Sequence, residues 1–295
     1  MKNFLDISDL DRDSILHIFD LSKMYDENFD LFPLKHKSIG LIFEKYSTRT
    51  RISFQVGINN LGGNPIDIKF EELNLQRSES FEDTFKIFSQ YLDLIIYRTS
   101  DHNKLIKAYS NFKKPIINAL SDRSHPCQII SDMFTLHKRF HSFDNLNISW
   151  FGDMNNVLFS YFQFLEFFPE VQLNLFTDKK IYNQKKNYFP QIKNLDVFFE
   201  LDQNIISKTD CIMTDVYTSM NDTESKSKET DLSKFQVNTN IMNITKKECI
   251  FAHCLPAKIG SEVTKEVLNS EKSIVLEQAR NRLVAQKGIL SWITN

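Results

Sequence analysis

The sequence is poor in glycine, carries little net charge and contains no long apolar run. Seven glycines occur in 295 residues, so each one is informative about a turn or a close approach of backbones. The net charge of −2 argues against a nucleic-acid-binding surface, which needs a clear basic excess. No apolar run approaches the ~18 to 20 residues that span a bilayer, so we expect no membrane segment. A small anionic ligand stays possible, because it requires only a local cationic pocket.

The four cysteines, Cys127, Cys211, Cys249 and Cys254, do not indicate a disulfide framework. The chain is long, and its first ten residues contain acids and no apolar signal segment. We therefore expect reduced cysteines and a cytoplasmic location. Cys249, His253 and Cys254 lie mostly on one predicted strand, where side chains alternate in direction, and no second ligand pair is suitably spaced. We expect neither a metal site nor a cofactor.

The order of apolar segments predicts two α/β domains. A length of 295 residues exceeds the ~250 at which a single core usually stops growing. Short apolar runs alternate with helical patterns, which is typical of a parallel sheet covered on both faces. The predicted fold is therefore a pair of doubly wound parallel-sheet domains linked by helices, with a C-terminal helix packing back on the first domain. The predicted boundaries are 1–135 plus the helix 274–295 for the first domain, and 145–270 for the second.

Nine segments are predicted strands, and six longer segments, five between them and one after the last, are predicted helices. The strands are 38–43, 64–70, 94–98, 114–120, 147–153, 171–178, 195–200, 210–216 and 249–255. The helices are 48–63, 80–92, 102–112, 125–140, 155–168 and 276–293. The stretch 217–235 is strongly polar and is predicted to be a surface loop, with a lid as its possible function.

The segment Ser47-Thr48-Arg49-Thr50-Arg51 begins a predicted helix directly after the strand 38–43. At a helix start the backbone N–H groups point outward and the helix dipole favours an anion. Hydroxyl and guanidinium donors suit a phosphate group. The alternative is a plain helix cap with two solvated arginines, and the segment alone does not decide between them. A nucleotide-binding P-loop is excluded because its glycine-lysine pattern does not occur.

Two further polar positions follow predicted strands in the first half. Arg98 ends the apolar run 94–98, and His125-Pro126-Cys127-Gln128 opens a helix after the strand 114–120. His125 and Gln128 are three residues apart, so they project from the same helical end; the alternative is a local cap with a surface histidine. In open α/β sheets ligands bind at the carboxyl ends of strands. The coincidence of Arg49, Arg98 and His125 at such ends favours an anion site.

The second half repeats this placement of polar residues. Gly152-Asp153-Met154-Asn155-Asn156 lies between a strand and a helix, Asp215 ends a strand, and His253-Cys254-Leu255-Pro256 ends another. Ser219 and Met220 follow Asp215 into the polar stretch, and Glu277, Arg280 and Arg282 lie on the last helix. Each of these features also has a plain interpretation as a turn, a cap or an exposed charged face.

Taken together and in this order, these motifs resemble the transcarbamylase family, and within it the ornithine branch. The segments that carry the resemblance are FEKYSTRTRISF, YR at 97–98, INALSDRSHPCQ, WFGDMNN, TDVYTSM, HCLP and a terminal E-x-A-x-N-R, which span about residues 38 to 290. S-T-R-T and H-P-x-Q are typical of the family in general, whereas HCLP and D-x-x-x-S-M resemble the ornithine branch. The chain departs from the family pattern at Asn221 in place of glycine, at Arg280 in place of glutamate and at Asn74 in place of glutamine, and the segment 74–79 also lacks a glycine common in the family.

The resemblance implies an activity and a set of roles. The carbamoyl group of carbamoyl phosphate would pass to the δ-amine of L-ornithine, giving L-citrulline and phosphate in arginine biosynthesis. Ser47, Thr48, Arg49 and Thr50 would hold the phosphate; Arg98, His125 and Arg282 would surround the carbonyl oxygen and phosphate; Gln128 and the backbone at Cys254 and Leu255 would hold the carbamoyl nitrogen. Asn156, Asp215, Ser219 and Met220 would bind ornithine, with Cys254 near the attacking amine. The family assembles as trimers or multiples of trimers.

Three alternatives stay open beside this interpretation. The amine substrate could be an acylated ornithine, putrescine or aspartate, although an aspartate enzyme should carry H-P-x-P in place of HCLP. A non-catalytic homologue would be favoured by loss of Arg49, His125 or Asp215, and all three are present. A general phosphate-binding α/β protein would leave the motifs of the second half unexplained.

Overall fold

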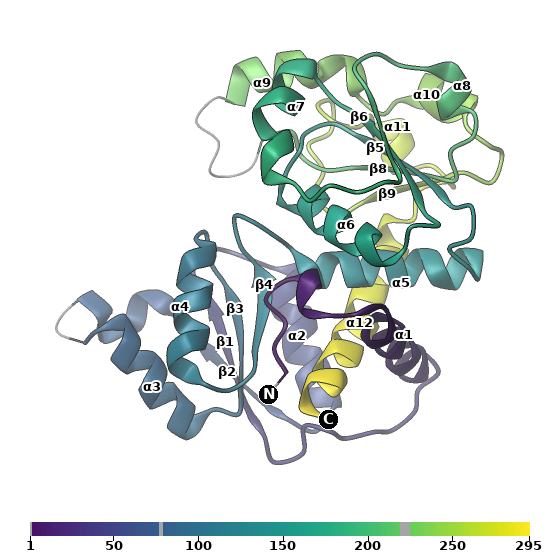
Figure 1. Ribbon diagram of the computed structural model, residues 1–295. Helices are drawn as coiled ribbons and strands as arrows, with labels where there is room; N and C mark the ends of the chain where they lie inside the picture. The colour runs from purple at the N-terminus through teal and green to yellow at the C-terminus, as the bar shows by residue number, and fades with distance from the viewer. Residues whose placement is uncertain (1, 77–78, 219–224) are drawn as a thin grey trace. The chain divides into compact units, whose positions relative to one another are not determined.

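The chain forms two compact units. The computed structural model describes residues 2–76, 79–218 and 225–295. Unit 1 comprises Met1–Phe134 together with Arg280–Asn295, and unit 2 comprises Thr135–Ala279 (Figure 1). Each unit is built on its own parallel sheet, so the predicted fold class of two parallel-sheet α/β domains is confirmed.

The sheet of unit 1 has four parallel strands in the order β2-β1-β3-β4. They are β1 (Ser38–Phe43), β2 (Asn64–Ile68), β3 (Leu94–Arg98) and β4 (Ile116–Leu120). The helices of this unit are α1 (Arg12–Asp26), α2 (Arg49–Asn60), α3 (Phe81–Tyr91), α4 (His102–Phe112), α5 (Pro126–Phe140) and α12 (Val275–Thr294), the last two crossing its sequence boundaries. From β1 the chain moves outward to β2, and from β3 it moves outward to β4 on the other side. The switch point of the fold therefore lies between the carboxyl ends of β1 and β3.

The N-terminal segment of the chain extends this sheet beyond β4. Phe4 makes a parallel bridge to Ile117: its N–H donates to Ile116 O at 2.9 Å, and its carbonyl accepts from the Asn118 N–H at 2.8 Å. A 3₁₀ turn, Ile7–Asp9, follows before α1 begins. Phe4 and Ile7 are fully buried, so this edge is part of the core. The sequence patterns did not predict this pairing.

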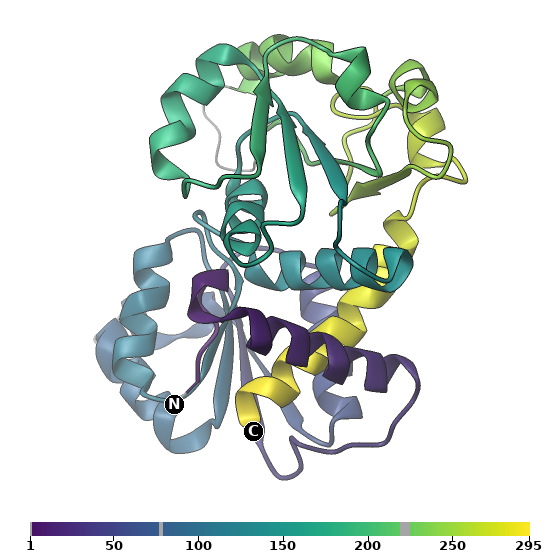
Figure 2. The same ribbon diagram turned by 45° about the vertical axis from the view of Figure 1, so that its right-hand side comes forward.

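Helices α1 and α12 cross closely at Gly288 (Figure 2). A Cβ at this position would lie 2.7 Å from the Ile18 carbonyl oxygen and would also contact Ser22 Oγ. We expect Gly288→Ala to lower the free energy of unfolding by about 1–3 kcal/mol, because backbone has to move to admit the methyl group. Gly57→Ala is the matched control: its new Cβ has no neighbour within 3.7 Å, so helix propensity should raise stability by about 0.5–1 kcal/mol. Urea unfolding of the two variants measures this contrast, and equal effects would contradict it.

The sheet of unit 2 has five parallel strands in the order β7-β6-β5-β8-β9. They are β5 (Asn147–Phe151), β6 (Gln172–Phe176), β7 (Leu195–Phe198), β8 (Cys211–Thr214) and β9 (Ile250–His253). The helices are α6 (Asn156–Phe167), α7 (Lys179–Lys185), α8 (Gln203–Ile206), α9 (Ser225–Leu232), α10 (Thr239–Ile244) and α11 (Lys265–Leu268). The chain leaves β5 toward β6 and returns to β8 on the other side. The switch point of this sheet lies between β5 and β8.

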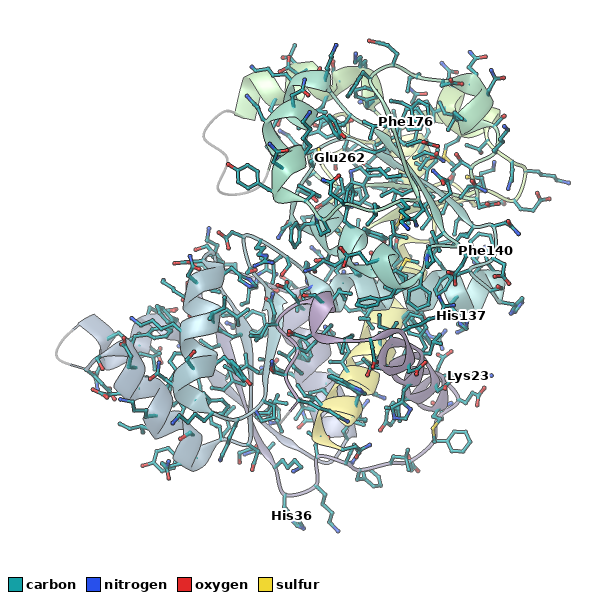
Figure 3. All side chains as sticks on the ribbon, viewed as in Figure 1. Lys23, His36, His137, Phe140, Phe176 and Glu262 are labelled. Carbon is teal, nitrogen blue, oxygen red and sulfur yellow. The ribbon has the colours of Figure 1, made fainter. Side chains whose placement is uncertain are left out.

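Aromatic side chains stack across one face of the second sheet. Phe176 lies between Phe151 and Phe198, with ring centroids 4.6 Å and 4.9 Å away (Figure 3). The three residues occupy matching positions on β5, β6 and β7. Their contact ties neighbouring strands together beyond the backbone hydrogen bonds, since offset aromatic pairs add about 0.5–1.5 kcal/mol each.

The prediction of a loop over 217–235 was wrong for residues 225–235. Ser225–Leu232 forms α9, and Ser233–Phe235 forms a 3₁₀ turn. Leu232 and Phe235 are fully buried, so two apolar residues anchor a segment that is otherwise polar. Residues 219–224 lie outside the described residues. Among the described helices, none has the length and apolarity that crossing a membrane requires.

Candidate active site

The first cluster of predicted site residues lies at the switch point of unit 1. Ser47 follows β1 and Arg98 ends β3, and Arg98 Nη1 donates a hydrogen bond to Ser47 Oγ at 3.4 Å. Thr48 is the N-cap of α2, but its side chain makes no capping hydrogen bond, and the first turn contains no acid. By contrast, a side chain accepts such a bond at the start of α1, α3 and α4. The N-terminus of α2, with Arg49 in its first turn, is therefore an electropositive end suited to an anion.

The two arginines of this segment have different surroundings. Arg51 Nη1 lies 3.2 Å from Asp67 Oδ2 on β2, and its guanidinium stands over the Phe43 ring at 5.3 Å. Arg51 thus ties α2 to the sheet, whereas Arg49 is half-buried at the helix start. Thr50 is buried, with 2% of its surface exposed.

Glu44 joins the two strands that flank the switch point. Its carboxylate accepts hydrogen bonds from Tyr97 Oη at 2.5 Å and Thr99 Oγ1 at 2.9 Å, and Lys104 Nζ lies 3.4 Å away. Its backbone N–H donates to Arg98 O at 3.0 Å. Burial, followed by the charge of Glu44, raises the pKa of Tyr97, so the phenol stays a hydrogen-bond donor. Sequence reasoning missed this role of Glu44, which fixes the backbone that carries Arg98.

His125, Gln128 and Arg282 form a buried group beside this switch point. Arg282 Nη2 donates to Gln128 Oε1, and Gln128 Nε2 donates to Asp132 Oδ1 at 2.7 Å. His125 and Arg282 are each only 5% exposed. Burial, with the positive charges of Arg282 and Arg98, holds the pKa of His125 well below 6.5. At neutral pH the group therefore presents a neutral imidazole among guanidinium groups, which is suited to an oxygen that gains negative charge.

The low pKa of His125 makes the stability of the protein depend on pH. In the unfolded chain a histidine takes up a proton near pH 6.5, whereas folded His125 resists it. Its contribution to stability is therefore present above pH 6.5 and is lost as the pH falls. We expect urea midpoints to drop between pH 7.5 and 5.5 more steeply in the native protein than in His125→Gln. His36→Gln, which removes an exposed histidine (Figure 3), serves as the control, and parallel curves for the native protein and His125→Gln would contradict the assignment.

The second cluster lies at the switch point of unit 2. Asp215 follows β8, and its two carboxylate oxygens have different donors: Asn155 Nδ2 at 2.7 Å and the Cys254 thiol at 2.9 Å. Asn155 also caps α6, because its Oδ1 accepts from the N–H groups of Val157 and Leu158. Sequence reasoning selected Asn156, which begins α6, and missed Asn155 as the partner of Asp215. An asparagine directly before a predicted helix was the available signal.

His253 holds the backbone that follows β9. Its Nδ1 accepts from the Leu255 N–H at 2.8 Å, and its Nε2 lies 3.1 Å from Glu262 Oε1. Glu262 is fully buried within unit 2 (Figure 3). Leu255 has a φ of 55°, a strained angle for a branched residue, and this hydrogen bond helps to hold it. The chain direction after Cys254 is thus set by a buried carboxylate and an imidazole.

A metal ion has one geometric candidate among the described residues. The potential ligand atoms of Asp215, His253 and Cys254 lie within 4.8 Å of one another. However, both ring nitrogens of His253 are engaged, one with Leu255 and one with Glu262. The thiol of Cys254 is likewise engaged with Asp215. Internal hydrogen bonds therefore account for the cluster, and a metal ion would have to displace them.

Ion pairs and a hydrogen bond hold Thr218 and the start of α9, which are the described residues nearest to 219–224. The buried carboxylate of Asp153 lies 2.9 Å from Lys185 Nζ and 2.6 Å from Lys228 Nζ, so it ties α9 to the loop after β5. Glu229 contacts both Thr218 and Lys258. The predicted ligands Ser219 and Met220, and the unusual Asn221, lie outside the described residues. Arg280, which departs from the family pattern, forms an ion pair with Asp26 at 2.8 Å, so its charge is matched within unit 1.

Comparison with known proteins identifies relatives over the whole chain. The family model described as the carbamoyl-P binding domain of aspartate/ornithine carbamoyltransferase matches residues 2–138, and the Asp/Orn binding domain of the same family matches residues 144–293. The chain is 36% identical to an ornithine carbamoyltransferase of Bradyrhizobium diazoefficiens, over 99% of this chain and 96% of that protein. The crystal structure of ornithine carbamoyltransferase from Thermus thermophilus superposes with a TM-score of 0.89 at 28% identity, covering 100% and 99% of the two chains. The enzyme from Pyrococcus furiosus gives 0.85 at 31% identity, covering 98% and 96%.

Proposed function

The chain belongs to the aspartate/ornithine carbamoyltransferase family, and on this premise we propose that it transfers the carbamoyl group of carbamoyl phosphate to the δ-amine of L-ornithine. The products are L-citrulline and phosphate. The observation that carries the proposal is the burial of His125 and Arg282, each only 5% exposed, with the Arg98 and Arg282 charges near enough to help lower the pKa of His125. Such a group is built to receive an oxygen on which negative charge develops.

The residues of unit 1 act on carbamoyl phosphate. Ser47, Thr48, Arg49 and Thr50 bind the phosphate at the start of α2, where the helix end and the guanidinium both favour an anion. When the amine attacks the carbamoyl carbon, electron density moves to the carbonyl oxygen, which Arg98, His125 and Arg282 stabilise. The C–O bond to phosphate then breaks and phosphate leaves on the same cationic groups. One fixed donor of this kind is typically worth about 3–4 kcal/mol of barrier.

The residues of unit 2 act on the amino acid. Asp215 accepts the α-amino group of ornithine, and Asn156, Ser219 and Met220 complete the binding of the zwitterion. Cys254 acts on the attacking δ-amine, whereas the carbamoyl nitrogen is assigned to Gln128, a residue of unit 1. No covalent intermediate is required, so the thiol serves as a polar neighbour of Asp215. The δ-ammonium has an ordinary pKa near ~10.4 and must lose a proton before it attacks, which desolvation in a cationic site promotes.

A ureido-product assay tests the proposed substrate. Purified enzyme is given carbamoyl phosphate with ornithine, N-acetylornithine, putrescine or aspartate, and the coloured ureido product is measured. We expect turnover with ornithine and at least a hundredfold lower kcat/KM with the other three amines. If another amine were turned over faster, that amine would be the substrate in place of ornithine. If no amine gave a product, the proposed carbamoyl transfer would be wrong.

The cellular setting of this activity is part of the proposal. We assign the enzyme to the cytoplasm and to arginine biosynthesis, with no nucleic-acid or membrane partner. All four cysteines lie within the described residues and are free.

We also propose that the chain assembles as a homotrimer or a multiple of trimers. Two apolar side chains one helical turn apart on α2, Ile52 and Val56, are 52% and 39% exposed, and Tyr46 just before the helix is 98% exposed. Such a surface is suited to burial against another subunit. We expect light scattering to give three chains or a multiple of three for the native protein and a smaller assembly for the Ile52→Glu/Val56→Glu double variant. A native monomer would contradict the assembly.

A further inference from the structure

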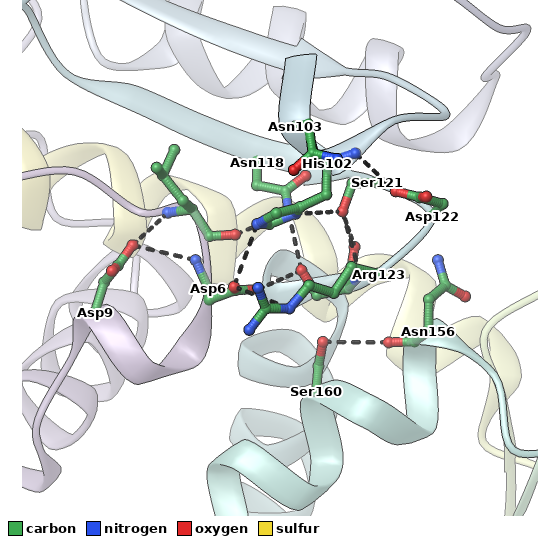
Figure 4. A network of polar contacts seen from close by, with 12 residues as sticks. Asp6, Asp9, His102, Asn103, Asn118, Ser121, Asp122, Arg123, Asn156 and Ser160 are labelled. Atoms are coloured by element: carbon green, nitrogen blue, oxygen red, sulfur yellow. Dashed lines mark hydrogen bonds and ion pairs between the residues drawn. The ribbon is translucent and has the colours of Figure 1, made fainter. Parts of the chain in front are cut away.

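The buried carboxylate of Asp6, in the N-terminal segment, belongs to a polar network with His102, Asn118, Ser121 and Arg123 (Figure 4), and it contacts Ser124, the residue before His125. We propose that Asp6 is a positioning residue for carbamoyl phosphate: through Ser124 it fixes the turn between β4 and α5, and thereby the direction in which His125 is presented. The inference rests on the proposed function and extends it to residues that touch neither substrate.

The turn itself is held by a reciprocal pair of hydrogen bonds. The Ser121 N–H donates to Ser124 O at 2.9 Å, and the Ser124 N–H donates to Ser121 Oγ at 3.2 Å. Both serines are fully buried, and His125 follows immediately. Any change in the position of Ser124 is therefore passed to His125 through one peptide unit.

Asp6, which belongs to the N-terminal segment, contacts this turn through its side chain. Its Oδ1 accepts a hydrogen bond from Ser124 Oγ, and its Oδ2 lies 3.5 Å from His102 Nε2 and 3.8 Å from Arg123 Nε. His102 Nδ1 in turn contacts Ser121 Oγ at 2.9 Å. One carboxylate thus reaches both serines of the turn, directly in one case and through an imidazole in the other.

The position of Asp6 is itself fixed by the sheet. Asn118 Nδ2 donates to both Leu5 O at 2.8 Å and Ser124 Oγ at 3.1 Å, so one β4 side chain holds the N-terminal segment and the turn together. Asp9 accepts from the backbone N–H groups of Leu5 and Asp6.

On balance the surroundings of Asp6 raise its pKa and so disfavour the charged carboxylate. Burial raises the pKa of Asp6, and the hydrogen bond from Ser124 with the charges of His102 and Arg123 acts in the opposite direction. Burial also lowers the pKa of His102. Burying a carboxyl group costs free energy unless hydrogen bonds satisfy it. The partners of Asp6 in and around the turn supply these hydrogen bonds, which fits a role of Asp6 in holding the turn.

The test compares Asp6→Asn with Asp11→Asn. Asp6→Asn keeps the shape and removes the charge, whereas Asp11, the exposed N-cap of α1, accepts a hydrogen bond from the Ser14 N–H of its own helix. We expect Asp6→Asn to raise the KM for carbamoyl phosphate about ten- to hundredfold, since small displacements of a supporting group act at this scale. The KM for ornithine should stay within about twofold, and Asp11→Asn should change neither constant. Equal changes in both KM values, or none, would overturn the positioning role.

A double-mutant cycle and hydrogen exchange give independent readouts. Ser124→Ala should reproduce most of the effect, and the double variant should be no worse than the more impaired single one, because both remove the same contact.

Amide exchange at Ser121 and Ser124 should accelerate in Asp6→Asn while that of β5 is unchanged. Additive effects of the two substitutions on the KM for carbamoyl phosphate would count against the inference. So would amide exchange that accelerates uniformly along the chain. Since exchange needs no turnover, a failure of the proposed activity would be seen separately, as a native enzyme without ureido product. Should Asp6→Asn not fold, Ser124→Ala alone carries the same expectations.

Discussion

Arg49→Ala is expected to lower kcat/KM for carbamoyl phosphate by about 10²- to 10³-fold, the scale typical of removing one donor to a developing charge. Arg49 is in the first turn of α2, at a helix end whose N-cap side chain makes no capping hydrogen bond. In the proposed mechanism its guanidinium adds a charge-assisted contact to the phosphate, which the helix end also favours. Initial rates at varied carbamoyl phosphate and saturating ornithine measure the loss.

Arg51→Ala is the matched control for this prediction. Arg51 belongs to the same segment but pairs with Asp67 and stands over Phe43. Because both members of the ion pair are about one-third exposed, its loss should cost at most about 1 kcal/mol of stability. The rate constants should stay within a few-fold of the native values. If both variants lost activity equally, or if Arg49→Ala stayed near normal, the phosphate site would have to lie elsewhere.

Asp215→Asn is expected to impair ornithine use by about 10²-fold or more while leaving carbamoyl phosphate binding largely intact. The substitution keeps the shape but removes the charge that would pair with the α-amino group, and loss of one partner of a hydrogen-bonded charge pair commonly costs about 2–5 kcal/mol. It also puts an amide where the Cys254 thiol and Asn155 now donate to oxygen. Kinetics at varied ornithine, with calorimetric titration of carbamoyl phosphate, separate the two substrates.

Asp210→Asn provides the control at the opposite end of the same strand. Asp210 precedes β8, pairs with Lys246 at 2.7 Å and accepts from the Asn147 N–H at 3.0 Å. We expect a modest loss of stability and unchanged kinetic constants. A selective loss of carbamoyl phosphate binding in Asp215→Asn would show that the roles proposed for the two units are reversed.

Most of the regular structure could be predicted from local patterns. The run 38–43 is β1 and 102–112 is α4, because a buried strand and an amphipathic helix each leave a periodic signal. The clustering of polar residues was predictable for a related reason, since parallel strands bring their carboxyl ends to one edge of a sheet. Arg98 beside Ser47 and Cys254 beside Asp215 are both of this kind.

Contacts between distant residues could not be predicted in this way. Asp6 and Ser124 are 118 positions apart, and nothing local marks an N-terminal aspartate as buried. Arg49 and Arg51 look alike in the sequence, and only the position of Asp67 on β2 separates their roles. The segment containing α9 appeared too polar to pack, because the average over many polar residues concealed the buried Leu232 and Phe235.

The division of unit 1 between the two ends of the chain has a consequence for biosynthesis. Proteins usually fold from the N-terminus as they leave the ribosome. Here residues 135–279 contain their whole unit, whereas the first 134 residues require 280–295 to complete theirs. The later unit can therefore fold first, whereas the earlier segment cannot complete its unit before residues 280–295 have been made. The early segment is therefore the one expected to need protection by chaperones.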